Sequence, residues 1–301
     1  VNGTTNTELA TLAESMEGAV GGYNLSNASY DSVSFNVSAQ DTIPLGIAFS
    51  VDGTKMFMVG DQGRDVNEYT LSTSVDISTA SFVDSFSVSA QESAPSGVTF
   101  NTNGTKMYVV GSVGDEVNQY TLSTGYDVST ASFSQFFSVA SQDTQPKDLA
   151  FNSDGTKMFI LGAGLDTVFE YSLSTAFNIS TASYSGTSFN IGSEDTNALG
   201  MFFNGNGTKM FILGATSKVV YQYTLSTGFD LTTASYSSLS FNINAQDSSP
   251  TGLAFSTNGD KMYIIGASSD SFHQYSTPSY TNQMDKTQLD AVTDPNHIAL
   301  G

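Results

Sequence analysis

A tetrapeptide that recurs at a nearly constant spacing constrains this chain more than any other feature. Gly-Thr-Lys-Met begins at Gly53, Gly104, Gly155 and Gly207, and a fifth copy, Gly-Asp-Lys-Met, begins at Gly259. The spacings are 51, 51, 52 and 52 residues, and a Tyr follows each Gly sixteen residues later. A fixed period of this length with strand-like content indicates an array of supersecondary units.

Each repeat has the pattern of four strands. In the first copy, residues 46–49 are a short apolar run, and Asp-Gly at 52–53 is a strong hairpin signal. Residues 55–59 (KMFMV) are apolar throughout, which is typical of a strand buried on both faces. Residues 66–71 alternate, so they predict a strand with one buried face, and residues 82–88 predict a more polar fourth strand.

Four antiparallel strands per repeat describe a propeller blade, and blades stack because one sheet cannot bury both of its apolar faces alone. The fifth repeat stops at Pro278, before its outer strand, whereas residues 25–38 match the outer-strand region 77–89. We therefore predict an all-β fold: a five-bladed β-propeller of four-stranded antiparallel blades, closed by an N-terminal outer strand that completes the last blade. Closure removes sheet edges that would otherwise invite aggregation.

The predicted organisation has three parts. Residues 1–24 hold a short N-terminal helix, expected at 5–17, and a linker; residues 25–278 form the propeller; residues 279–301 are a C-terminal tail that we expect to lead to a further domain.

Composition narrows the classes of partner. The formal net charge is −20, from 29 acidic and 9 basic residues, which argues against nucleic acid because phosphate binding needs clustered Lys and Arg. No apolar run is long enough to span a bilayer, so we expect no membrane insertion. Cysteine is absent, which excludes thiolate catalysis and cysteine-metal sites.

The repeat resembles a known family. It is similar to the bacterial and phage propeller repeats that pair an inner P-x-G-h-A-F segment (h apolar) with N-x-D/N-G-T-K-M-Y-V-x-G, akin to YVTN and lactonase-like propellers. The matching segments are Pro44 to Gly60, Pro95 to Gly111, Pro146 to Gly162, Pro250 to Gly266, and 198–214 with Ala198 in place of Pro. The resemblance implies a propeller fold, and the repeat sequence is similar to repeats in marine phage and bacterial surface proteins. Propellers host enzymes, lectins and scaffolds alike, so it does not imply one function.

The loops between blades carry an acidic residue at one repeat position, preceded by Gln or, once, by Glu. These candidate ligand-binding residues are Gln40, Asp41, Gln91, Glu92, Gln142, Asp143, Glu194, Asp195, Gln246 and Asp247. In a propeller they would share one face. One interpretation is a site for a sugar, a cationic partner or a cation, where oxygen ligands would suit Ca²⁺; no other cofactor is predicted. The other is that each carboxylate accepts backbone N–H bonds in a tight turn.

The opposite face carries the Gly-x-Lys hairpins, so we expect it to be relatively basic. The only histidines are His273 and His297. His273 falls on the third strand of the last blade, where we expect a surface position, and His297 lies in the tail. Two distant histidines make neither a metal centre nor a catalytic triad. We therefore assign no catalytic residue and no metal ligand.

These features favour a non-enzymatic, surface-displayed binding or structural module, at an extracellular location or on a virion surface. It would belong to a phage fibre or a bacterial adhesin, recognise a host-surface glycan or protein receptor, and contact other structural subunits. The alternatives are a Ca²⁺-dependent, lactonase-like hydrolase and a purely structural spacer. Asymmetric polar clusters on one face would favour the enzyme, and five equivalent pockets would favour multivalent binding.

Overall fold

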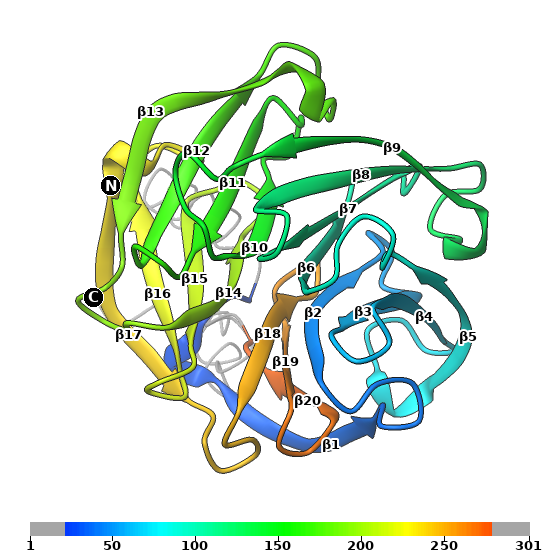
Figure 1. Cartoon of the computed structure of the whole chain (residues 1–301). Helices are drawn as coiled ribbons and strands as arrows, with labels where there is room; N and C mark the ends of the chain where they lie inside the picture. The colour runs from blue at the N-terminus through cyan, green and yellow to red at the C-terminus, as the bar shows by residue number, and fades with distance from the viewer. Residues whose placement is uncertain (1–21, 279–301) are drawn as a thin grey trace, which may run out of the picture.

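The computed structural model describes residues 22–278, which form five four-stranded antiparallel sheets arranged in a ring (Figure 1). Blade one consists of β2 (Pro44–Phe49), β3 (Lys55–Gly60), β4 (Asp65–Leu71) and β5 (Ala80–Ser87). Blade two consists of β6 (Pro95–Phe100), β7 (Lys106–Gly111), β8 (Glu116–Leu122) and β9 (Ala131–Ser138). Blade three consists of β10 (Pro146–Phe151), β11 (Lys157–Gly162), β12 (Thr167–Leu173) and β13 (Ala182–Asn190).

The last two blades follow the same order, with one exchange at the end of the chain. Blade four consists of β14 (Ala198–Phe203), β15 (Lys209–Gly214), β16 (Val219–Leu225) and β17 (Ala234–Asn242). Blade five consists of β18 (Pro250–Phe255), β19 (Lys261–Gly266), β20 (Ser271–Ser276) and, from the N-terminus, β1 (Ser29–Asn36). The predicted five-bladed propeller is therefore confirmed.

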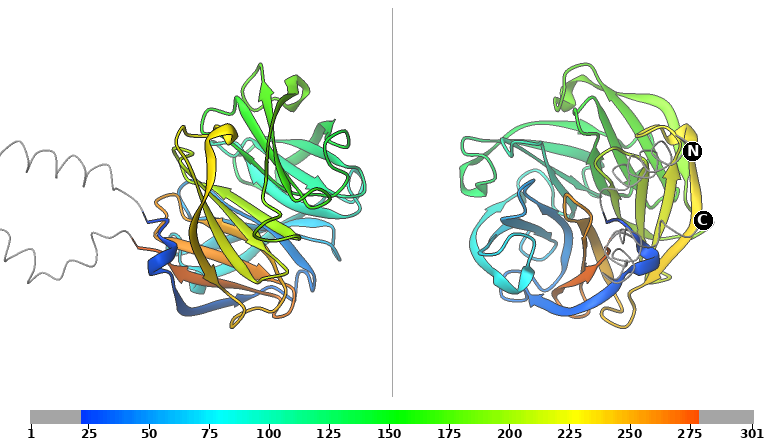
Figure 2. Two further views of the ribbon diagram at one scale, coloured as in Figure 1. Left: turned by 90° about the vertical axis from the view of Figure 1, so that its left-hand side faces the viewer. Right: turned by 180° about the vertical axis from the view of Figure 1, so that it is seen from behind.

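The N-terminal strand closes the ring as predicted. β1 pairs antiparallel with β20, with Tyr30 opposite Tyr275 and Phe35 opposite Phe272. The preceding residues also bind blade five, because the Gly22 backbone N–H donates to the Asn258 carbonyl at 2.9 Å. Both ends of the described chain consequently lie beside the hairpin of blade five, on one face of the disc (Figure 2).

A short 3₁₀ helix precedes every outer strand. These helices are η1 (Leu25–Asn27), η2 (Ile77–Thr79), η3 (Val128–Thr130), η4 (Ile179–Thr181) and η5 (Leu231–Thr233). Each is capped by an Asp or Asn whose side chain accepts a backbone N–H two residues on, as Asp127 does from Ser129 at 3.2 Å. Within residues 22–278 no helix has the length and apolar character needed to cross a membrane.

The core lies between the blades. Met56, Phe57, Met58 and Val59 on β3 are all 0% exposed, as the doubly apolar pattern predicts. Each inner strand also sends a Phe onto an aromatic ring of the preceding blade, with centroids 4.4 Å apart for Phe49 and Tyr263. Aromatic pairs at this distance stabilise the contact beyond the area they bury.

Two predicted segments fall outside the described residues. They are the helix expected at 5–17 and the tail at 279–301.

Candidate functional site

The propeller has two faces with different loops. We call the loop face the one that carries the inter-blade loops and the loops between second and third strands. We call the hairpin face the one that carries the Gly-x-Lys hairpins and the 3₁₀ helices. The predicted ligand-binding residues lie on the loop face.

The acidic residue of each inter-blade loop is buried and accepts backbone N–H groups. In blade one, Asp41 is 2% exposed and accepts from Ile43 N at 2.6 Å and from Gly63 N at 2.7 Å. Ile43 belongs to the inter-blade loop and Gly63 to the loop between second and third strands. One carboxylate therefore holds two loops together.

The other four blades repeat this arrangement. Glu92, Asp143, Asp195 and Asp247 are 1–4% exposed, and each accepts a backbone N–H two residues on as well as one from the second-to-third loop. The carboxylate also covers the Gly that ends the second strand. A Cβ at Gly60 would overlap the Asp41 carboxylate, so only Gly fits there. This geometry matches the turn interpretation of these residues.

The residue before each acid accepts a hydrogen bond from the repeat tyrosine. Tyr171 Oη donates to Gln142 Oε1 at 3.0 Å, and Gln40, Gln91 and Gln246 accept in the same way from their own tyrosines. In blade four Glu194 accepts from Tyr223 at 3.1 Å. The structure thus places all ten predicted residues in one ring of loops. Direct ligand contact by them stays a prediction.

The exposed part of the loop face lies at the loop tips. Val113 is 66% exposed, Leu165 is 59% exposed and Ile43 is 42% exposed. These three apolar side chains belong to blades two, three and one, which are neighbours in the ring. The sequence does not single them out, because an apolar residue in a polar loop carries no periodic signal.

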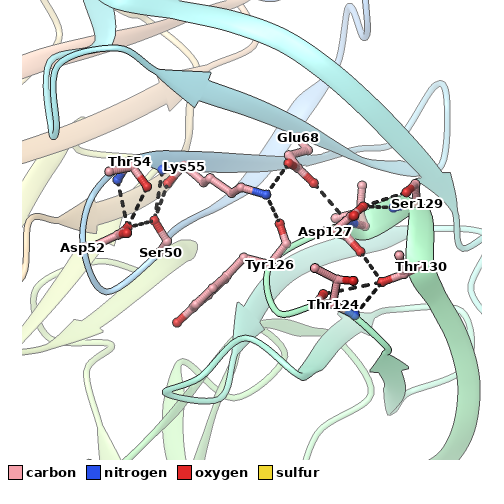
Figure 3. A network of polar contacts seen from close by, with 11 residues as sticks. Ser50, Asp52, Thr54, Lys55, Glu68, Thr124, Tyr126, Asp127, Ser129 and Thr130 are labelled. Atoms are coloured by element: carbon pink, nitrogen blue, oxygen red, sulfur yellow. Dashed lines mark hydrogen bonds and ion pairs between the residues drawn. The ribbon is translucent and has the colours of Figure 1, made fainter.

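On the hairpin face, four of the five repeat lysines connect neighbouring blades, whereas Lys261 binds Asp31 and Ser276 within blade five. Lys55 Nζ lies 2.7 Å from the buried Glu68 carboxylate and donates to the Tyr126 carbonyl of blade two, also at 2.7 Å (Figure 3). Glu68 in turn accepts the Val128 N–H at 3.0 Å. Lys106 reaches the carbonyl of Phe177 in the next blade at 2.8 Å. These four lysines therefore act as links between blades.

The predicted surface position of His273 is wrong, because its side chain is buried. His273 is 6% exposed. Its strand, β20, pairs with β1 from the N-terminal end of the chain, and Ser34 lies opposite His273. Burial lowers the His273 pKa, although the nearby Asp247 opposes this shift, so the imidazole is neutral near pH 7.

His273 belongs to a polar cluster that occurs only in blade five. Its Nε2 lies 3.0 Å from Ser269 Oγ, and Ser269 Oγ donates to Asp247 Oδ2 at 2.6 Å. Because the Ser269 hydrogen goes to Asp247, His273 Nε2 donates to Ser269, and its buried Nδ1 has no partner among the described residues. In a catalytic triad the imidazole instead accepts the serine proton and a carboxylate orients its other nitrogen. The cluster has the residue types of a triad without its connectivity.

No grouping of three or more His, Cys, Asp or Glu side chains within residues 22–278 has a geometry that could hold a metal ion. In the acidic ring, the carboxylate oxygens already accept backbone N–H groups, and among the described residues they are not grouped around a shared point where a cation could bind.

Fold and site together define a closed five-bladed β-propeller whose paired loops are held by buried carboxylates. No protein-family model and no curated protein matches the sequence. Among solved structures, a functionally unknown protein from Desulfotomaculum acetoxidans aligns at 12% identity and a TM-score of 0.47, over 74% of this chain and 62% of its own.

Two further solved structures align to a similar extent. A provisionally assigned 6-phosphogluconolactonase from Bacteroides fragilis aligns at 14% identity and a TM-score of 0.45, over 66% of this chain and 55% of its own. A Lactobacillus plantarum protein aligns at 13% identity and a TM-score of 0.45, over 74% of this chain and 63% of its own. This chain thus spans roughly three fifths of the length of the structures it matches. These values are too low to transfer an activity.

Proposed function

We propose that this chain is a non-enzymatic binding module whose loop face meets a host-surface glycan or protein receptor. It would work in a surface-displayed assembly, such as a phage fibre or a bacterial adhesin, at an extracellular or virion-surface location. One observation carries the proposal: every blade fixes its pair of loops with a buried carboxylate, while the exposed tips of those loops differ between blades.

The constant part of the loop builds the platform. Asp41 and its four equivalents tie each inter-blade loop to the adjacent second-to-third loop through backbone N–H groups. Loops held in this way lose little conformational entropy when they bind a ligand. A rigid array of short loops is a common way in which a scaffold carries a binding surface.

The variable part is what a ligand would meet. The exposed tip position holds Gln62, Val113, Gly164, Thr216 and Ser268 in blades one to five. Turn chemistry alone would allow one residue type to recur, as it does in the hairpins. The tips instead give the loop face a more apolar sector on blades one to three, through Ile43, Val113 and Leu165, and a hydroxyl-rich sector on blades four and five. This favours one composite surface over five identical pockets.

The test is binding of the full chain to a glycan array and to intact marine bacteria, with Ca²⁺ and with a chelator. We expect specific binding that survives chelation, because the ring carboxylates already accept backbone N–H groups. Binding that disappears with chelator would instead support the Ca²⁺ interpretation of the ring. The absence of binding under every condition would contradict the proposal and favour a structural spacer.

A hydrolase is the second candidate, and the Ser269–His273–Asp247 cluster is the observation that favours it. The cluster lies on the loop face of one blade and breaks the repeat symmetry, as catalytic groups do. Hydrolysis of small lactones would be measured with Ca²⁺, with chelator, and after Ser269→Ala. We expect no turnover, because Ser269 donates to Asp247 rather than to His273. Turnover that Ser269→Ala abolishes would reverse this choice.

A further inference from the structure

Four of the five inner strands carry a glycine at one repeat position, where they lie close to a neighbouring inner strand. These glycines are Gly46, Gly97, Gly200 and Gly252. A Cβ on Gly46 would lie 2.7 Å from the Gly97 Cα, closer than real contacts allow, and a Cβ on Gly252 would overlap the Leu45 carbonyl. A side chain at Gly46 or Gly252 would collide with the backbone of a neighbouring inner strand.

Blade three breaks this pattern with an acidic residue. Asp148 stands where the other blades have Gly, and its side chain is only partly exposed. Asp148 Oδ1 accepts from Leu149 N at 2.8 Å, and Oδ2 accepts from Met201 N of blade four, also at 2.8 Å. A carboxylate has about four lone-pair positions, so both oxygens retain acceptor capacity. Burial raises the pKa of Asp148 to about 7, although the two N–H groups oppose the shift.

A cavity of about 270 Å³ lies on the hairpin side of this repeat position, with Asp148 among the residues that line it. Its wall runs along the inner strands from Asp148 and Leu149 to Asn152 and Ser153 at the hairpin end of blade three. We call this cavity the well. Of the residues of β10 that line it, Asp148 lies farthest from the hairpins, so it forms the floor of the well. Among the described residues that line the well, it is the only acidic or basic side chain.

The wall of the well is aromatic. Its phenylalanines are Phe49, Phe100, Phe151, Phe177, Phe202, Phe203 and Phe255. Five of them recur at one repeat position, but Phe202 is an addition, since the other blades have Ala or Thr there. Its ring lies 5.2 Å from Phe255 and 6.1 Å from Tyr23, measured between centroids. Asp148 and Phe202, two departures from the inner-strand repeat, thus line one cavity from adjacent blades.

We propose that this well binds a small organic cation, with its ammonium group on the Asp148 carboxylate and its apolar body against the phenylalanines. A carboxylate and aromatic faces both attract a cation, and they do so more strongly where water is excluded. Small-ligand pockets are typically apolar cavities of about 300 Å³ or more with a few polar groups that fix orientation. A bound ammonium would also offset the cost of holding an ionised carboxylate at the end of an apolar well.

The test uses benzylamine and benzyltrimethylammonium as cationic probes and benzyl alcohol as the uncharged comparison, with the full chain in a calorimeter near pH 7.5. We expect both cations to bind more tightly than the alcohol. Asp148→Gly, which installs the residue of the other four blades, should weaken the cations at least tenfold and leave the alcohol unchanged. Phe202→Ala, also taken from the repeat, should weaken all three probes.

Equal binding of cation and alcohol, no binding of any probe, or unchanged cation affinity in Asp148→Gly would each overturn the proposal. Circular dichroism and thermal unfolding of each variant establish that the ring is intact. If Asp148→Gly does not fold, Asp148→Asn removes the charge at nearly constant volume and is held to the same criterion.

Discussion

At the scale of single residues, the buried carboxylates of the loop face show how one side chain can fix two loops. Asp143 accepts from Gln145 N at 2.6 Å, from Leu165 N at 2.9 Å and from Gly164 N at 3.2 Å. Its removal leaves these N–H groups without their acceptor.

We expect Asp143→Ala to lower the free energy of unfolding by about 2–3 kcal/mol, because three partly buried N–H donors lose a charged partner together. Urea denaturation measures the change. The control is Asp84→Ala on the exposed outer strand β5, which we expect to stay within about 0.5 kcal/mol of the parent. Equal effects of the two substitutions would show that the loop carboxylates do not hold the loops.

Asp148 makes stability depend on pH in a defined direction. In the folded chain it keeps its proton up to about pH 7, whereas an Asp in an unfolded chain loses it near pH 4. Unfolding therefore releases a proton between these values. The free energy of unfolding is therefore highest, as far as Asp148 is concerned, below about pH 4. It falls by up to about 1.4 kcal/mol per pH unit as the pH rises towards 7.

Urea denaturation of the parent and of Asp148→Asn between pH 4 and pH 8 checks this dependence. As the pH rises to about 7, the parent should lose stability relative to Asp148→Asn, and above that pH the difference between the two should stay constant. A difference that does not vary with pH would mean that Asp148 titrates normally.

The roles of single residues can be predicted from the sequence only in part. The spacing of Asp41 and its equivalents indicates a structural turn, because a residue that a turn needs recurs in every repeat. The burial of His273 is not visible in the sequence, because polar residues such as Asn67 and Asn118 occupy its repeat position and suggest exposure, although both are buried in the structure. The replacement of Gly by Asp148 can be seen in an alignment of the repeats, but the cavity beside it requires the structure.

At the scale of elements, the link between blades one and two rests on a buried ion pair. Glu68 is 2% exposed and binds both Lys55 Nζ and the Val128 N–H of the next blade. Three other blades have Gln at the position of Glu68, and Gln119 accepts the corresponding N–H from Ile179 at 3.4 Å. A neutral amide can therefore serve the same contact.

We expect Glu68→Gln to change the free energy of unfolding by less than about 1 kcal/mol. Lys55→Met should cost about 3 kcal/mol, because it leaves the Glu68 carboxylate buried without its cation. The double variant should recover most of that loss. Chemical denaturation of the three variants gives the comparison, and equal costs for the two single substitutions would contradict the assigned roles.

The strands themselves follow from sequence more reliably than the pieces between them. The Asp-Gly hairpin and the apolar run after it predict β2, β3 and their turn, and Gly53 has a φ of 68° as such a turn requires. The outer strand was expected at 82–88 and spans Ala80–Ser87, because a three-residue 3₁₀ helix turns the chain just before it. The Asp or Asn that caps each such helix is its only local signal, and that signal also suits an ordinary turn.

At the scale of the whole molecule, closure depends on one strand. β1 covers β20, and without it blade five would expose an unpaired edge and the apolar residues beneath.

A chain that begins at Val37 lacks β1, and we expect it to lose cooperative thermal unfolding and to associate. Gel filtration and calorimetry measure both effects. A chain that begins at Gly22 retains every described contact of the closing segment and is the matched control. A monomeric, cooperatively folding chain without β1 would contradict the closure.

The ring architecture could be predicted from the sequence because five copies of one pattern report the same structure independently. Function could not, because the repeat mainly encodes what all blades share. The features that differ between blades, namely the loop tips, the cluster around His273 and the well at Asp148, gain meaning only from their positions in the ring.

The most direct test of the proposed function is a cell- and glycan-binding assay on one matched set of variants. Val113→Asp combined with Leu165→Asp alters two exposed loop tips, whereas Val83→Asp alters an outer-strand residue that is 50% exposed. We predict that the loop-tip variant loses binding while the Val83→Asp variant binds as the parent does. Undiminished binding by the loop-tip variant, or equal loss in both, would show that the loop face is not the surface this propeller uses.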